Sequence, residues 1–302
     1  MGSLKIFYET FEIVVSIIIP YYNRISNVES AVKSVFSQSN TEWELFLIDD
    51  CSNEDNGSIL KYKEGPQGQL IHHRRNEVNR GPGYSRNCGI KEACGEYLVF
   101  LDSDDILKDT YLEKMIREIT SDLLFVYCNA SWVDGTIYKN SDVSHQSVLP
   151  TLIQYGRPWH TVSIFWNKLY VPFFDEELRS WEDYLFEFTA ALTNNRITHI
   201  NEVLVLVGKV GELSLSSHSG TLTGWLNKLK AIDRMLAKLE FTGLFRNIKL
   251  VCFLLLKYTY FAIRLQNVGN STNIKFNSKI LRFIPSNVWV LKVLNKCLRI
   301  VK

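Results

Sequence analysis

The chain has 302 residues, of which 46% are hydrophobic and 22% are charged. This balance excludes a disordered chain and supplies enough apolar side chains for a large core, at a length between one average domain and two. The net charge of +2 conceals an uneven distribution, because residues 221–302 carry 15 Lys and Arg against two acidic residues. A cationic end predicts a separate role at an anionic surface.

Apolar strands and amphipathic helices alternate along the first half of the chain. Strands are expected at 14–19, 45–48, 70–72, 97–101 and 123–128, and helices at 27–37, 82–93 and 110–119. This alternation predicts the α/β class, with a mostly parallel, Rossmann-like sheet flanked by helices on both faces.

Beyond residue 133 the pattern is weaker. Strands are expected at 159–166 and 203–207, a helix at 181–192, and basic helical stretches near 222–239, 243–265 and 288–300. We place a boundary near Gly220, which predicts an α/β domain at 1–220 and a helical basic extension at 221–302. The apolar run 250–256 ends at Lys257 and is too short for a membrane-spanning helix.

The cysteines and the N-terminus both favour the cytoplasm. None of the six cysteines forms a Cys-x-x-Cys pair, which argues against a zinc site and fits a reducing compartment. The first residues lack the basic start, apolar stretch and small-residue cleavage site of a secretory signal.

Polar residues follow three of the predicted strands at their carboxyl ends. They are residues 20–23, 49–52 and 102–105. Ligands of open parallel sheets bind at this edge, so the three clusters are predicted to meet there. Five clustered carboxylates need a counter-charge, which a divalent cation with oxygen ligands supplies. The competing interpretation of Asp102-Ser103-Asp104 is a turn or a helix cap, but its place directly after an apolar strand favours a site.

In order and spacing, these clusters resemble the family 2, GT-A-type inverting glycosyltransferases of bacterial polysaccharide biosynthesis. The matching segments are 15–23, 47–52, 79–89 and 100–105 and, less specifically, 166–170 and 181–183. The resemblance covers roughly residues 14–215. It implies inverting transfer of a sugar from a nucleotide diphosphate, with a UDP-sugar favoured, to a hydroxyl of a glycan or of a polyprenyl-diphosphate-linked acceptor.

The resemblance also implies roles for the residues on the donor side. Pro20, Tyr21 and Asn23 would line the pocket for the nucleotide base and ribose, and Asp50 would accept a hydrogen bond from the base. Cys51 departs from the family, which usually has glycine at this place.

Further along the chain, Arg86 would reach the diphosphate or the base, and Asp102 with Ser103 would contact the ribose or the donor sugar. The competing interpretation of Arg86 is a helix-surface arginine paired with an acid such as Glu92.

Two acidic residues would act on the reaction itself. Asp104 would hold Mn²⁺ or Mg²⁺, and Asp183 would be the catalytic base. The alternative for Asp183 is an ordinary first-turn acid at a helix start, which is compatible with a base because the helix dipole keeps it ionised. His218 follows in a loop that could reach back to the metal, although an isolated histidine in a polar stretch is usually a surface residue.

Other functions compete with this interpretation. A dinucleotide-dependent dehydrogenase would need Gly-x-Gly-x-x-Gly after the first strand, and a nucleotidyltransferase would need a glycine-rich basic loop there, whereas this chain has Pro-Tyr-Tyr-Asn. A non-catalytic carbohydrate- or nucleotide-binding or scaffolding protein on the same fold remains the alternative.

The basic extension also has two interpretations. Cationic helices with leucine and aromatic faces predict attachment to the inner face of the cell membrane, and the alternative is a solvated helical cap. Nucleic acid is not expected as a partner, because residues 1–220 are acidic overall.

Overall fold

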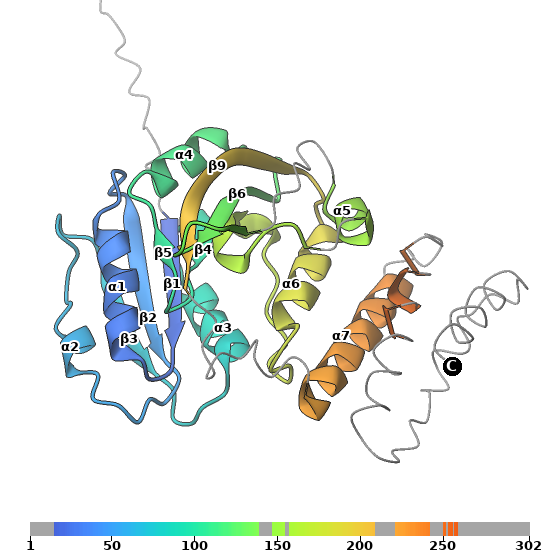
Figure 1. Ribbon diagram of the computed structural model, residues 1–302, viewed down its shortest axis with the longest axis horizontal. Helices are drawn as coiled ribbons and strands as arrows, with labels where there is room; N and C mark the ends of the chain where they lie inside the picture. Colours follow the sequence, from blue (N-terminus) through green and yellow to red (C-terminus); the bar gives the residue numbers. More distant parts are fainter. Residues whose placement is uncertain are drawn as a thin grey trace, which may run out of the picture.

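The computed structural model describes residues 15–138, 147–154, 157–208, 221–241, 250–251, 253–255 and 257–258. In this part of the chain a curled nine-stranded sheet is covered by helices on both faces (Figure 1). The strands are β1 (Val15–Tyr21), β2 (Trp43–Asp49), β3 (Ile71–Arg75), β4 (Tyr97–Phe100), β5 (Ile106–Leu107), β6 (Phe125–Trp132), β7 (Ile137–Tyr138), β8 (Ile164–Asn167) and β9 (Ile197–Val207). The helices are α1 (Ile25–Phe36), α2 (Gly57–Leu60), α3 (Pro82–Glu92), α4 (Tyr111–Glu118), α5 (Val148–Gln154), α6 (Glu182–Ala191) and α7 (Leu222–Phe241).

The sheet has a parallel half and a mixed half. Its order is β3-β2-β1-β4-β8-β6-β9-β5, and β3, β2, β1 and β4 are parallel to one another, as the alternating pattern predicts. In the other half β8 runs antiparallel to both β4 and β6, and β5 runs antiparallel to β9. The sequence did not predict this change of strand direction. A strand covered on both faces is apolar throughout, whether it runs parallel or antiparallel to its neighbours. The strand expected at 159–166 was wrong in its first half, where a 3-10 turn, Thr161–Ser163, precedes β8.

Alternate residues of β1 pack into two separate cores. Ile17 and Ile19 belong to the cluster beneath α1 and α4, whereas Ile18 belongs to the cluster beneath α3 and α6. All three are fully buried, which confirms the continuous apolar run as a central strand.

Helix α7 contributes to the second of these cores. Its buried residues Ile232, Met235 and Leu239 share a cluster with Phe186 and Phe188 of α6, and the two helices lie side by side in Figure 1. The predicted boundary near Gly220 and the predicted metal ligand His218 fall outside the described residues, as does the helix expected at 288–300. Of the helix expected at 243–265, the described residues between 250 and 258 are helical. Within the described ranges, every helix is too short or too polar to cross a bilayer.

Candidate functional site

The polar clusters after β1 and β2 meet at the carboxyl edge of the sheet. The backbone N–H of Asn23 donates to Ser52 Oγ at 2.8 Å, and Asn23 Oδ1 accepts the backbone N–H of Asn53 at 2.8 Å and that of Glu54 at 3.2 Å. Asn23 therefore joins the two loops. The cluster after β4 is tied to the same edge by Arg24, whose Nη1 lies 3.5 Å from Asp104 Oδ2. The predicted convergence of the three clusters is confirmed.

Strained backbone gathers in the loops around this edge. Asn23, Arg24, Cys51 and Trp181 are the non-glycine residues with positive φ in the described part of the chain, at 55° to 66°. Such conformations are costly for side-chain-bearing residues and tend to cluster at functional sites. Cys51 has a φ of 66°, a conformation that glycine adopts without steric cost. A cysteine at this position, where the family usually has glycine, therefore strains the backbone.

Two of the five predicted carboxylates serve the loops themselves. Asp49 accepts hydrogen bonds from the Ser52 N–H at 2.7 Å and from Asn56 Nδ2 at 3.1 Å, and it pairs with Arg75. Asp50 is also buried. Neither carboxylate belongs to the group of acids that follows β4.

The oxygens of Asp50 accept the backbone N–H groups of Arg80 at 2.9 Å and Gly81 at 2.7 Å, and the amide of Asn76 at 2.9 Å. Asp50 thereby fixes the loop that starts α3. Its predicted contact with the nucleotide base would use the remaining capacity of these oxygens and stays a prediction.

The two tyrosines after Pro20 point to different places. Pro20 pairs with Ile48 within the sheet, and Tyr21 is buried in the core beneath α1, with its hydroxyl 3.4 Å from Asn56 Nδ2. Burial raises the pKa of Tyr21 to about 12. Tyr22 is instead 43% exposed, whereas Tyr21 is 3% exposed, and the predicted role of Tyr21 in the nucleotide pocket stays a prediction.

Arg86 lies buried between two carboxylates of different elements. Its Nη2 donates to Asp102 Oδ1 at 2.7 Å and its Nη1 donates to Glu182 Oε1 at 3.3 Å, so it links α3, the loop after β4 and the start of α6. The alternative of a surface arginine was wrong, because only 4% of Arg86 is exposed and Glu92 pairs with Arg74 instead. The predicted reach of Arg86 to a diphosphate stays a prediction.

The acidic cluster after β4 is crowded. The pKa of Asp104 is raised, first by burial and next by the charge of Asp102. Asp102, Ser103 and Asp104 are all partly exposed. Asp105 is buried, accepts the Gly208 N–H at 2.9 Å and has its other oxygen 3.7 Å from His160 Nδ1. A Cβ at Gly208 would lie 2.3 Å from the Asp104 carbonyl oxygen, so only glycine allows β9 to approach the cluster this closely.

Asp183 lies in the first turn of α6 and is held from both sides. Its Oδ1 accepts the Tyr184 N–H at 2.8 Å, while its Oδ2 pairs with Arg157 and accepts the Thr161 hydroxyl at 3.3 Å. Burial alone would raise the pKa of Asp183, but Arg157, Arg86 and the Tyr184 N–H together bring that pKa below its ordinary value. Asp183 is 24% exposed, so a ligand can reach an ionised carboxylate.

The two glutamates of α6, Glu182 and Glu187, have raised pKa values, in contrast to Asp183. Burial, and next the charge of Asp183, raise the pKa of Glu182 to about 7, and burial likewise raises the pKa of Glu187 to about 7. Glu187 accepts Arg157 Nη2 at 2.7 Å and the Trp159 indole N–H at 3.0 Å. Sequence reasoning missed Arg157 and Glu187, because the segment around Arg157 has no periodic pattern that would place it against α6.

The carboxylates after β4 suit a hard divalent cation. Among the residues that the structure describes, no three His, Cys, Asp or Glu side chains are grouped to hold a metal by themselves. Mg²⁺ is usually bound by one or two carboxylates together with substrate phosphates, and Asp102 and Asp104 provide that donor set. The pKa of Asp104 is raised first by burial and next by the charge of Asp102, and a bound cation would oppose both effects.

The first comparison is with curated protein sequences. The poly(ribitol-phosphate) beta-N-acetylglucosaminyltransferase TarS of Staphylococcus aureus is 30% identical over 200 residues, 62% of this chain and 34% of that protein. The putative teichuronic acid biosynthesis glycosyltransferase TuaG of Bacillus subtilis is 40% identical over 103 residues, 34% of this chain and 40% of that protein. An uncharacterized glycosyltransferase of Rickettsia bellii is 32% identical over 179 residues, 56% of this chain and 25% of that protein. The chain thus spans between a quarter and two fifths of these relatives.

The second comparison is with solved structures. TarS residues 1–349 in complex with UDP-GlcNAc match with a TM-score of 0.63 at 21% identity, covering 89% of this chain and 79% of that one. The mannosyltransferase PcManGT of Pyrobaculum calidifontis, in complex with GDP-Man and Mn²⁺, matches with a TM-score of 0.56 at 13% identity, covering 85% of this chain and 76% of that one. At these identities the likeness shows the fold, which is GT-A. Residues 16–191, more than half of the chain, match glycosyl transferase family 2, and the chain therefore belongs to that family.

Proposed function

We propose that this protein transfers a sugar, with inversion, from a nucleotide diphosphate to a hydroxyl of a glycan or lipid-linked acceptor in cell-surface polysaccharide synthesis. The observation that carries the proposal is the pair of acids at the start of α6: Asp183 is kept ionised and partly exposed, beside a buried Glu182 whose pKa is raised. An acceptor hydroxyl has a pKa far above 7, so a positioned carboxylate must take its proton as it attacks.

The donor side follows from the residues around Arg86 and Asp102. A departing nucleotide diphosphate carries growing negative charge, and Mn²⁺ or Mg²⁺, held by Asp104 with Asp102, would supply Lewis-acid stabilisation there. Asn23, Ser103 and Asp50 would hold the nucleoside, with Tyr22 exposed next to them. The TarS relative was solved with UDP and with UDP-GlcNAc, which favours a UDP-sugar donor for this chain.

Donor binding with and without metal tests this assignment. A UDP-sugar at 100 times its dissociation constant should stabilise the protein by about 2.7 kcal/mol in a thermal-shift assay with Mn²⁺, and GDP- and dTDP-sugars should do less. Chelation by EDTA should weaken donor binding and lower transfer at least tenfold. Asp104→Asn should remove most of the metal dependence, while Asp122→Asn, an exposed acid paired with Arg196, should not. Transfer at full rate in EDTA contradicts the metal assignment, and no stabilisation by any nucleotide sugar supports the non-catalytic alternative on this fold.

The pH dependence of transfer distinguishes the two acids on α6. With Asp183 as the base, kcat/KM should stay level between pH 6 and pH 8, because the lowered pKa keeps Asp183 ionised over that range. With Glu182 as the base, kcat/KM should fall toward tenfold per unit below pH 7, since its pKa is about 7. Initial rates at saturating metal in overlapping buffers measure the profile, and a steep loss below pH 7 would assign the base to Glu182.

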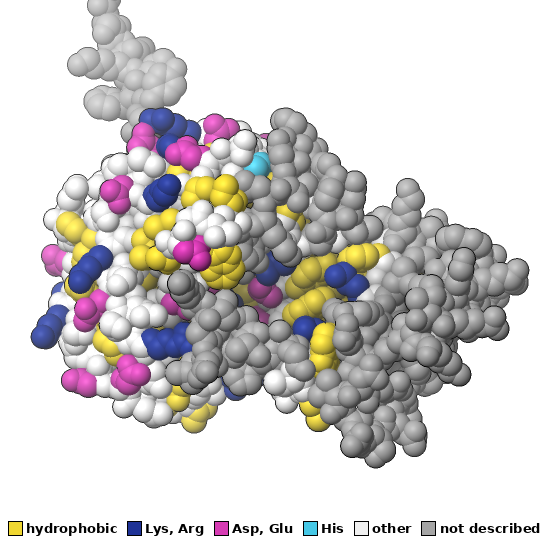
Figure 2. Space-filling model, viewed as in Figure 1, with side chains coloured by type: hydrophobic (Ala, Val, Ile, Leu, Met, Phe, Trp, Pro, Cys, Tyr) yellow, Lys and Arg dark blue, Asp and Glu magenta, His cyan; other side chains and the backbone are white. Residues whose placement is uncertain are grey.

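The basic extension, residues 221–302, bears on where in the cell the protein acts. We propose that residues 221–302 attach it to the anionic inner face of the cell membrane, where a polyprenyl-diphosphate-linked acceptor would be found. On the face seen in Figure 2, acidic and basic side chains are interspersed over the described α/β part. The cation excess lies in the extension, which has 15 Lys and Arg against two acidic residues. Helix α7 buries its apolar stripe in the core, and its exposed Leu222 and Leu226 are available for contact with lipid.

Flotation with anionic liposomes tests the attachment. The chain should float with the vesicles at low salt, and 0.5 M salt should release it, because each basic residue adds at most about 1 kcal/mol and is screened. Changing the eight Lys and Arg beyond Tyr258 to glutamine should abolish flotation. Equal flotation of the wild type and this variant would contradict an electrostatic attachment and favour the helical cap.

A further inference from the structure

One loop leads directly to the proposed base. Residues 173–181 lie between the 3-10 turn Lys168–Tyr170, which follows β8, and α6, and Asp183 follows two residues beyond the end of this loop. Because a loop of this length has many accessible conformations, the position of Asp183 depends on what holds the loop at its two ends.

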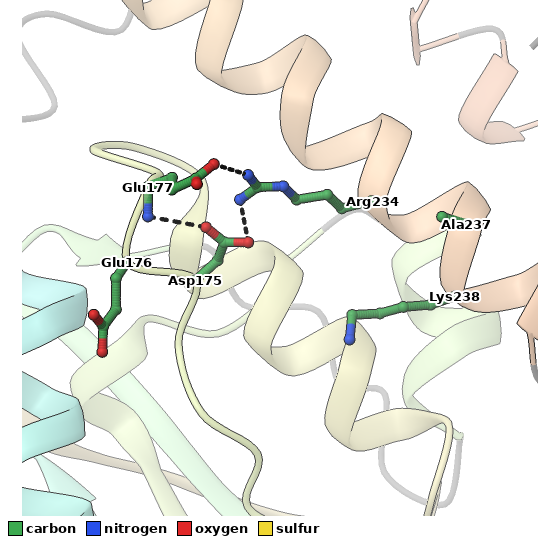
Figure 3. Close-up of a pocket in the computed structure, with 6 residues that line it drawn as sticks. All are labelled: Asp175, Glu176, Glu177, Arg234, Ala237 and Lys238. Atoms are coloured by element: carbon green, nitrogen blue, oxygen red, sulfur yellow. Dashed lines mark hydrogen bonds and ion pairs between the residues drawn. The ribbon is translucent and has the colours of Figure 1, made fainter. Parts of the chain in front are cut away.

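The start of the loop is held by α7. Arg234 of α7 forms ion pairs with both Asp175 and Glu177, and Figure 3 shows its side chain extending from the helix to both carboxylates across an open cavity. Arg234 lies in the same helix as Met235, which is buried against α6, so its backbone is anchored in the core.

The end of the loop is held by the helical residues near 257. Lys257 Nζ lies 5.6 Å from the centre of the Trp181 ring and 5.7 Å from that of Tyr184, and the two rings stack at 4.8 Å. Trp181 caps α6 with φ of 66°, a conformation that is costly for an aromatic residue, and its carbonyl accepts the Leu185 N–H at 3.1 Å. The backbone of Trp181 thus sets the direction of the turn that carries Asp183.

The middle of the loop faces the donor side. Glu176 accepts Asn87 Nδ2 at 3.0 Å and Arg80 Nη2 at 3.1 Å, and Arg179 donates to the Asn79 side chain at 3.3 Å. The loop therefore bridges the donor-side residues at the start of α3 and the cationic side chains of the C-terminal region.

We infer that the C-terminal region is part of the catalytic machinery, with Lys257 and Arg234 as positioning residues for Asp183. The two cations hold the loop at each end, and Lys257 stabilises the strained Trp181 through the ring faces. This inference rests on the proposed role of Asp183 as the base. It gives the basic extension a function in the reaction itself, in addition to any attachment to a surface.

The test is Lys257→Met, which keeps the aliphatic stem and removes the charge. It should lower kcat about fivefold while the dissociation constant of the donor stays unchanged, because the predicted donor residues lie in β1, in α3 and in the loops after β1, β2 and β4, whereas Lys257 acts at the Trp181 end of the loop. Lys257→Arg should restore kcat, since an arginine also binds over aromatic rings. Lys228→Met is the matched control: Lys228 lies 3.9 Å over Trp225 of the same helix, α7, and its loss should leave kcat unchanged.

The Trp181→Gly variant tests whether Lys257 acts through Trp181. Trp181→Gly removes both the ring and the backbone strain, so Lys257→Met added to it should lower kcat no further. Arg234→Met should also lower kcat about fivefold, and the Arg234→Met, Lys257→Met double variant more than either change alone.

Hydrogen exchange at the Leu185 amide gives a readout that does not need activity. Lys257→Met should speed exchange there several-fold and leave the amides of α1 unchanged. If the wild type transfers no sugar, the proposed function fails, yet this exchange result still tests the positioning. Unchanged exchange with unchanged kcat overturns the inference, as does an equal loss of kcat in Lys228→Met, which would mean a general effect on stability.

Discussion

Replacing Asp183 by asparagine should lower the rate of sugar transfer about 10³-fold, the usual contribution of a general base. Asparagine keeps the size of the side chain and can still accept the Tyr184 N–H through its oxygen, but it cannot take a proton. Donor affinity should stay within a few-fold, because the base acts on the acceptor in the transition state. Steady-state kinetics with the preferred donor and titration of donor binding measure the two quantities.

The matched control for this change is Asp122→Asn. Asp122 is also paired with an arginine, Arg196, and also has a lowered pKa, but it lies at the surface before β6, so its loss should leave transfer unchanged. A variant at Asp183 that no longer binds the donor would identify Asp183 as a binding residue and move the base elsewhere.

Replacing Arg86 by methionine should lower the free energy of unfolding by about 3 kcal/mol at pH 8, because it strips the counter-charge from a buried carboxylate. Without Arg86 the pKa of Glu182 rises further, so at pH 8 the folded variant must either bury a second negative charge beside Asp183 or take up a proton, and either costs free energy. The loss should shrink toward pH 6. Glu182 already has a raised pKa of about 7, so below that pH it holds a proton in the folded state and carries no charge to be compensated.

Urea unfolding at the two pH values measures this effect. Arg74→Met is the control, since Arg74 pairs with Glu92 at the surface and such a pair contributes at most about 1 kcal/mol. Adding Glu182→Gln to Arg86→Met should recover a large part of the loss. An Arg86→Met variant as stable as the wild type at pH 8 would mean that Glu182 finds another partner.

The sequence predicted the parallel half of the molecule well for a physical reason. In β1, β2 and β4 the apolar runs are bounded by polar clusters, so strand ends and site residues are marked by the same change of composition. The start of α6 was also predictable, since a tryptophan and two acids precede its apolar face.

What the sequence could not predict depends on contacts between distant segments. Arg157 and His160 are brought to the site by a 3-10 turn and by the insertion of β8 between β4 and β6, neither of which has a periodic signature. Neighbouring residues can also differ in burial: Tyr21, the last residue of β1, lies in the core, whereas Tyr22, just after the strand, is exposed. The pairing of Arg86 with two carboxylates likewise follows from packing that no spacing encodes.

The packing of α7 against α6 has a consequence for the order in which the protein is made. The proposed base lies on α6, but the core beneath α6 is completed by Ile232, Met235 and Leu239, which leave the ribosome at least some forty residues later. At a synthesis rate of about 5–20 residues per second, the nascent chain spends seconds with β1, β2 and β4 made and this core still open. Cotranslational folding should therefore close the donor side first, and a chain whose synthesis stops before α7 should not become a competent enzyme.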